Sequence, residues 1–153
     1  MDRCEKAVEY FKEGYACSQA LALSFSDLTS ISFDDMKKLS LGLGAGLGRM
    51  RLTCGAISSI SLIVGMLFYN ESLSIEENKV MVYEIVRDIA NRFMEKYGTI
   101  NCKTLLENAG LEVQVGGKPE KRSIYYYEKR PCEKIVYYAA KMLEEYLIEK
   151  GRL

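Results

Sequence analysis

The sequence predicts an all-α fold, a single-domain helical bundle packed around one buried central helix over about residues 53–70. Two observations predict it. The run 53–70 is uncharged and long enough for a helix, and its apolar side chains leave no polar face. Apolar residues elsewhere recur every three or four positions, which is typical of amphipathic helices. A helix that is apolar on every side has to be enclosed, so we expect the other helices to surround it.

Helix start and stop signals divide the rest of the chain. Ser32 and Ser74 suit the N-cap position, and Ser74 forms a capping-box pattern with Glu77. Gly98 is a typical helix stop, and Pro131 suits a helix start. The expected helices besides the central one cover about residues 2–14, 16–28, 32–42, 74–98, 101–106 and 131–151.

One segment departs from the helical pattern. Side chains alternate between apolar and polar over 111–115, two glycines follow at 116–117, and a second run of large side chains covers 123–127. This arrangement permits a small β-hairpin insert at about 111–127, and a mobile insert is the alternative. No domain boundary is expected there, so residues 1–153 are predicted to form one domain.

The central run has a competing interpretation as a membrane span, because no charge lies between Arg51 and Glu71. Three serines in its first turns, the slightly negative mean hydropathy of the chain and the lack of a second such run favour a buried helix. No membrane insertion is therefore expected.

The glycine-rich stretch before the central helix invites a nucleotide-binding interpretation. Its order over 42–48 is G-x-G-x-G-x-G, which contains neither G-x-G-x-x-G nor a G-K-S/T sequence, and no strand-like run precedes it. We interpret it as a tight, closely packed connection.

The charge balance and the first residues of the chain restrict its expected partners and compartment. The chain has 21 basic and 21 acidic residues, so it has no global basic field that would attract nucleic acid. The first residues lack the apolar core of a signal peptide, and a cytoplasmic location is expected. The five cysteines are then expected to be reduced, which favours metal or redox chemistry over structural disulfides.

Histidine is absent from the chain. This excludes a Ser-His or Cys-His nucleophile pair, an HExxH zinc site and a histidine-ligated haem built from this chain alone. Thiolate is the group that remains for soft-metal or electron chemistry.

Four of the cysteines share one kind of position. Each is expected in the first turn of a different helix, where free N–H groups and the helix dipole favour a negatively charged sulfur and predict a lowered thiol pKa. If these helix starts converge, they form a cup that suits a cluster held by thiolates. The four are Cys17, Cys54, Cys102 and Cys132.

The residues around Cys54 add to this expectation. Arg49 and Arg51 precede it and supply positive charge, and Gly55 begins a stretch of small residues that leaves room for a bound group. Cys4 lies on the apolar stripe of the first helix and is interpreted as an inert core residue. There is no C-x-x-C pair, so any shared site has to be assembled by tertiary folding.

The sequence resembles the family of redox-active proteins named for the cysteine signature C_GCAxxG_C_C. Ser59 stands where the final glycine of that signature is expected, and Cys4 has no counterpart in it. The resemblance rests on Cys17 within Gly14–Ala20, on Cys54-Gly55-Ala56 after the glycines, on Cys102 after Ile100-Asn101, and on Cys132 after Arg130-Pro131.

The resemblance implies a small helical redox protein in which the four cysteines form one site, with an iron–sulfur cluster as its cofactor. Relatives include haem-bearing cytochromes in which this kind of domain is linked to an iron–sulfur centre, but this chain lacks the haem attachment motif. We expect a cluster of the two-iron type, with Arg49 and Arg51 tuning its potential. We also expect an electron carrier or redox sensor that meets a redox partner protein, in preference to an enzyme with its own substrate.

Three alternatives remain at this point. A metal-free thiol-disulfide oxidoreductase would use a pair such as Cys17 and Cys54, and structural zinc would use all four sulfurs. A helical interaction module would use the cysteines only for packing. Tyr125 to Tyr127 and the insert are candidates for a contact in a homodimer.

Overall fold

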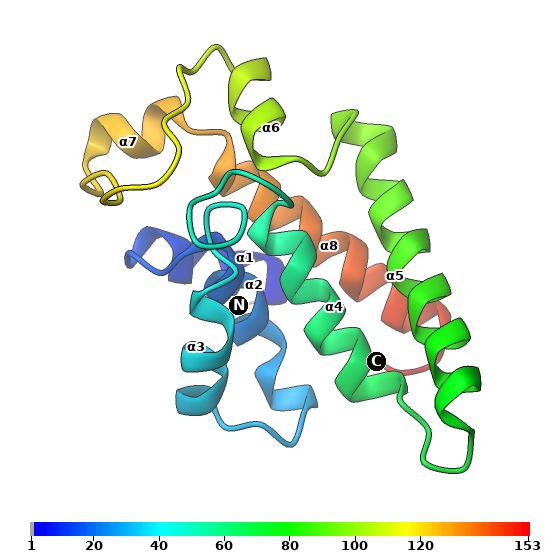
Figure 1. Cartoon of the computed structure of the whole chain (residues 1–153). Helices are drawn as coiled ribbons and strands as arrows, with labels where there is room; N and C mark the ends of the chain where they lie inside the picture. Colours follow the sequence, from blue (N-terminus) through cyan, green and yellow to red (C-terminus); the bar gives the residue numbers. More distant parts are fainter. Residues whose placement is uncertain (1) are drawn as a thin grey trace.

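The computed structural model describes residues 2–153 and confirms the all-α prediction (Figure 1). In that part of the chain the ordered elements are helices joined by turns and coil. They are α1 (Arg3–Lys12), α2 (Cys17–Phe25), the short 3-10 helix η1 (Ser26–Leu28), α3 (Phe33–Leu41), α4 (Gly55–Phe68), α5 (Ile75–Tyr97), α6 (Cys102–Asn108), α7 (Ile124–Lys129) and α8 (Cys132–Glu149).

Helix α4 is the predicted central helix and runs through the middle of the molecule (Figure 1). It packs against α2, α5 and α8, and α1 packs against α2 and α8 on the other side. Ile60, Ile63 and Val64 of α4 are almost completely inaccessible to solvent. Enclosure by three helices explains why most of this run needs no polar face, and Met66 on the remaining side is exposed.

N-cap residues set where several helices begin. Asp2 accepts a hydrogen bond from the Glu5 N–H at 2.7 Å, and Ser74 accepts one from the Glu77 N–H at 3.0 Å. Both form complete capping boxes, because each glutamate side chain accepts a hydrogen bond from the N-cap N–H in return. Helix α5 ends at Gly98, whose φ of 79° is a left-handed conformation that glycine adopts without strain.

Helices α2 and α4 approach closely at a pair of serines. The Ser59 hydroxyl, fully buried on α4, donates a hydrogen bond to the Ser18 carbonyl oxygen of α2 at 2.7 Å. Serine in place of the signature's glycine therefore leaves the two helices in close contact, because its one polar group finds a partner in the neighbouring backbone.

The hairpin prediction for about 111–127 is wrong. Residues 111–123 form a coil without regular structure, and α7 follows with Ser123 as its N-cap. The coil pairs with another part of the chain instead of forming a hairpin: the Gly116 N–H donates to the Arg49 carbonyl at 2.9 Å, and Arg51 Nε donates to the Gln114 carbonyl at 3.0 Å. Two strands joined by the 116–117 turn would need those backbone groups for each other.

Two further expectations bear on the surface of the molecule. Tyr126 and Tyr127 turn inward and pack on Phe11 with ring centroids 6.3 and 5.7 Å away, which leaves Tyr125 as the exposed tyrosine of the three. Among residues 2–153, no helix combines the length and the apolar character that crossing a bilayer requires.

Candidate functional site

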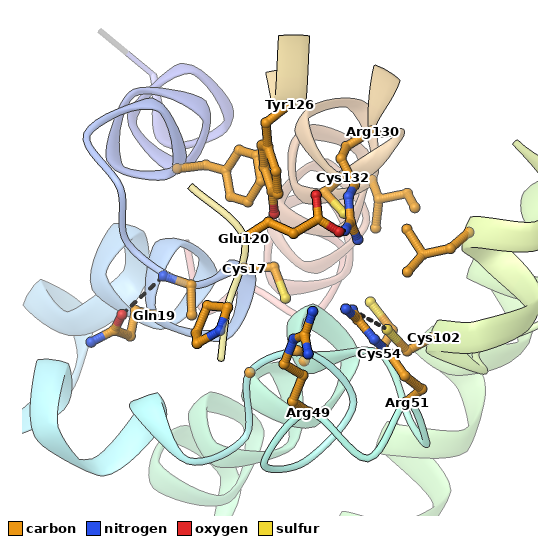
Figure 2. A pocket seen from close by; sticks show the side chains of 18 of the residues that line it. Cys17, Gln19, Arg49, Arg51, Cys54, Cys102, Glu120, Tyr126, Arg130 and Cys132 are labelled. Carbon is orange, nitrogen blue, oxygen red and sulfur yellow. Dashed lines mark hydrogen bonds and ion pairs between the residues drawn. The ribbon is translucent and has the colours of Figure 1, made fainter. Parts of the chain in front are cut away.

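All four cysteines at helix starts line one cavity of about 460 Å³ (Figure 2). The cavity lies where the first turns of four helices meet. Cys17, Cys102 and Cys132 are the first residues of α2, α6 and α8, and Cys54 is the N-cap of α4. Cys4 does not line it and is buried in the hydrophobic core instead.

A short stretch of backbone pairing brings Cys54 and Cys102 together. Thr53 and Asn101 form an antiparallel β-bridge, which is an isolated one. On either side of it the Cys54 N–H donates to the Ile100 carbonyl at 2.7 Å, and the Cys102 N–H donates to the Leu52 carbonyl at 2.5 Å. Cys54 and Cys102 are thus diagonal neighbours in an antiparallel pair, a relation that places both side chains on the same face.

The glycine-rich connection before Cys54 has an unusual backbone. Residues 45–49 and Arg51 all have positive φ, and four of these six residues are not glycine. The left-handed conformation costs a non-glycine residue about 1–2 kcal/mol. The loop closes on itself so tightly that a Cβ on Gly46 would lie 2.5 Å from the Leu52 nitrogen. A strained conformation of this kind persists where the surroundings over-determine it, and such places cluster at functional sites.

This loop directs the side chains of Arg49 and Arg51 into the cavity (Figure 2). Both are buried, with exposed fractions of 8% and 6%. Arg51 Nη1 lies 3.7 Å from the Cys102 sulfur, and Arg49 Nη1 donates to the Gly116 carbonyl. Within residues 2–153 neither guanidinium forms an ion pair with a carboxylate.

Gly55 is required by the position of a cysteine sulfur. A Cβ at Gly55 would lie 2.9 Å from the Cys17 sulfur and 2.9 Å from the Leu43 carbonyl oxygen. The absence of a side chain therefore lets the start of α4 contact the start of α2 beside the cavity. Next to this contact is the Ser18 hydroxyl, a buried polar group without a hydrogen-bond partner in the described chain.

The segment 111–130 covers the cavity, and sequence reasoning missed its contribution. Arg122 anchors it by donating to the Phe11 and Tyr15 carbonyl oxygens, each at 3.0 Å, and its guanidinium lies over the Phe11 ring at 4.4 Å. Arg130 pairs with Glu120 at 2.5 Å. The basic composition of this segment is visible in the sequence, but the targets of Arg122 are distant backbone carbonyls that no local pattern indicates.

The expected lowering of the thiol pKa at the helix starts is wrong for three of the cysteines. Burial raises the pKa of the Cys132 thiol to about 12, and burial also raises the pKa of Cys17 and of Cys54. The backbone N–H groups of Ala56 and Ile57 act in the opposite direction on Cys54, but the loss of water outweighs them. These thiols are therefore protonated at neutral pH in the chain alone.

The chemistry of the donor set fits a thiolate-bound group. In residues 2–153 no three Cys, His, Asp or Glu side chains meet closely enough to hold a single metal ion. The four sulfurs are spread around one cavity instead. Four cysteines without histidine form the ligand set of the common iron–sulfur clusters.

The fold and the cavity together define a small helical protein with four cysteines from four helix starts around one space. A family model described as putative redox-active protein (C_GCAxxG_C_C) matches residues 15–146, and the chain belongs to this family. The match includes all four cysteines of the cavity. Comparison with curated proteins and with solved structures gave no significant match.

Proposed function

We propose that Cys17, Cys54, Cys102 and Cys132 bind an iron–sulfur cluster of the two-iron type and that the protein transfers electrons or senses redox state through it. One observation carries this proposal. The cavity that the four cysteines line also contains the buried guanidinium groups of Arg49 and Arg51, which have no carboxylate partner among residues 2–153.

Buried charges are normally paired, because an isolated charge loses its hydration without compensation. If the cysteines stayed neutral, Arg49 and Arg51 would lack a counter-charge. Four thiolates around a cluster carry net negative charge and supply it. The 3.7 Å contact between Arg51 Nη1 and the Cys102 sulfur supports this, because the two charges would meet there.

A bound cluster of this kind accepts and releases single electrons at a potential that hydrogen bonds to its sulfurs and nearby charge adjust. Arg51 would donate to the Cys102 sulfur, and Arg49 would add positive charge nearby. Both effects stabilise the more negative, reduced form. We therefore assign the two arginines to raising the reduction potential of the site.

The raised thiol pKa values favour the metal-bound over the metal-free function. A dithiol oxidoreductase needs a thiolate at neutral pH, but burial raises the pKa of both Cys17 and Cys54. Coordination by a metal deprotonates a thiol outright, so burial is no obstacle to a bound cluster.

The test is anaerobic purification from iron-replete cells, followed by absorption spectra and analysis of iron and sulfide. We expect coloured protein with about two irons per chain, as for a two-iron cluster. Cys→Ala replacement at residue 17, 54, 102 or 132 should remove more than half of the bound iron. Colourless, iron-free wild-type protein would contradict the proposal.

Cys4→Ala is the matched control, because Cys4 is equally a buried cysteine but lies outside the cavity. It should keep the iron and sulfide content of the wild type. Equal loss from Cys4→Ala and the four site variants would show that the iron depends on folding and not on these four sulfurs.

A further inference from the structure

The charged groups around the cavity are strongly one-sided. Four arginines line it against a single acidic residue, Glu120. Arg122 is occupied by the backbone carbonyls of Phe11 and Tyr15 and by an aromatic ring. The other three arginines come from two different segments, and their guanidinium groups point into the space between the cysteines (Figure 2).

These three guanidiniums retain donors that the protein does not use. Arg49 donates through Nη1, Arg51 through Nε and Nη1, and Arg130 through Nη2. Their remaining N–H groups make no hydrogen bond within residues 2–153, and none of their nitrogens is both buried and unpaired. These donors are therefore open to a ligand that enters the cavity.

Glu120 shows what kind of group the cavity accepts. It belongs to the coil of 111–123, and its side chain is 49% exposed, whereas that of its partner Arg130 is only 9% exposed. The Glu120 carboxylate reaches in from the coil and lies beside Arg130 and Cys132 (Figure 2). A carboxylate thus already occupies part of the cationic wall, and it is held there by one ion pair.

The cavity has room for a small organic anion. Its volume of about 460 Å³ lies in the range of roughly 300–1,000 Å³ that is usual for small-molecule sites. A planar carboxylate complements the fork of a guanidinium group with two parallel hydrogen bonds, and the Glu120 carboxylate already pairs with Arg130 on this wall.

We infer that the cavity binds a small monocarboxylate on its arginine-lined wall, between Arg49, Arg51 and Arg130, where it displaces the carboxylate of Glu120. The Glu120 carboxylate then competes with the free carboxylate for Arg130. Removing its charge should strengthen binding of the free carboxylate, and removing the Arg130 charge should weaken it.

If the proposed cluster is bound, the carboxylate also changes its reduction potential, a consequence that rests on the proposed function. Reduction adds one negative charge to a cluster in this cavity, so the carboxylate binds the oxidised form more tightly than the reduced form. Preferential binding to the oxidised form lowers the reduction potential. The limiting slope is about 59 mV for each tenfold rise in carboxylate concentration in a one-electron couple.

The experiment titrates the metal-free chain of residues 1–153 with sodium acetate at constant ionic strength and measures binding by calorimetry. Glu120→Gln is compared with Glu112→Gln, which removes the same charge from the same coil but lies outside the cavity. We expect Glu120→Gln to bind acetate about five- to tenfold more tightly than wild type and Glu112→Gln to stay within about twofold. Arg130→Gln should lose about tenfold, whereas Arg87→Gln, exposed on α5, should not change.

Absence of acetate binding in both wild type and Glu120→Gln overturns the inference, and so does an equal gain from Glu120→Gln and Glu112→Gln. The metal-free titration does not depend on the cluster. Acetate binding in a chain that never takes up iron would support the carboxylate site and reject the proposed function. In iron-loaded protein, a reduction potential that falls with acetate supports the coupling, and one that does not respond rejects it.

Discussion

Replacement of Gly55 by alanine tests the contact on which the cavity is built. The added methyl group would lie 2.9 Å from both the Cys17 sulfur and the Leu43 carbonyl oxygen, and 3.1 Å from the Ser18 Cβ. All three neighbours belong to packed backbone or short side chains, so none can move away freely. The start of α4 would have to shift away from α2.

The expected change in the free energy of unfolding follows from two opposing effects. Overpacking of a well-packed region costs about 1–3 kcal/mol, and exchange of glycine for alanine in a helix contributes at most about 1 kcal/mol in the other direction. We expect Gly55→Ala to lower the free energy of unfolding by about 1–2 kcal/mol. At about 2–4 °C per kcal/mol for a chain of this size, the Tm should fall by about 2–8 °C.

Gly65→Ala is the matched control in the same helix. A Cβ at Gly65 meets nothing within 4 Å, and Gly65 has an ordinary helical backbone. This variant should gain about 0.5–1 kcal/mol from helix propensity alone. Urea unfolding of both variants in the metal-free state measures the difference. A Gly55→Ala protein as stable as Gly65→Ala would refute the argument that Gly55 is needed for close contact with Cys17.

Two further predictions concern the strained loop and the buried thiols. Leu47→Gly should raise the free energy of unfolding by about 0.5–1 kcal/mol, because relief of left-handed strain at φ 69° exceeds the added entropy of the unfolded chain. The control Leu39→Gly, in the right-handed helix α3, should lower the free energy of unfolding by about 1 kcal/mol. Urea unfolding midpoints of the two variants measure these changes, and an equal loss of stability in both variants would show that the loop is unstrained. Stability of the metal-free protein should also fall as the pH rises from about 9 to about 12, because burial raises the pKa of Cys4 to about 12 in the folded chain and the unfolded chain releases that proton first. Urea midpoints across this range should fall less steeply for Cys4→Ala, and identical slopes would contradict the role of Cys4.

The fold was largely predictable because its signals are local. The capping boxes at Asp2 and Ser74, the helix stop at Gly98 and the uncharged run of α4 each depend on residues within one or two turns of one another. The segment 111–127 was predicted wrongly because alternation with a double glycine resembles a hairpin. Its hydrogen bonds instead join Gln114 and Gly116 to the loop that contains Arg49 and Arg51.

The candidate site was also predictable in part. The expectation of thiolate chemistry followed from four cysteines at helix starts and from the absence of histidine. The thiol pKa was predicted in the wrong direction, because the helix starts of Cys17, Cys54 and Cys132 are buried and the loss of water outweighs the nearby N–H groups. Burial is a property of the whole fold, and one helix start does not reveal it.

The amino-acid sequence by itself determined where the helices begin and end, which residue types are available for chemistry, and membership of a four-cysteine family. Only the tertiary structure decided that the four sulfurs face one cavity, that Arg49 and Arg51 lie there without carboxylate partners among residues 2–153, and that Glu120 and Arg130 cover it. The physical reason is range. Capping and helical periodicity act between neighbours in the chain, whereas desolvation and the pairing of polar groups depend on residues from distant segments. Arg51 and Gln114, for example, are 63 positions apart and meet only in the folded state.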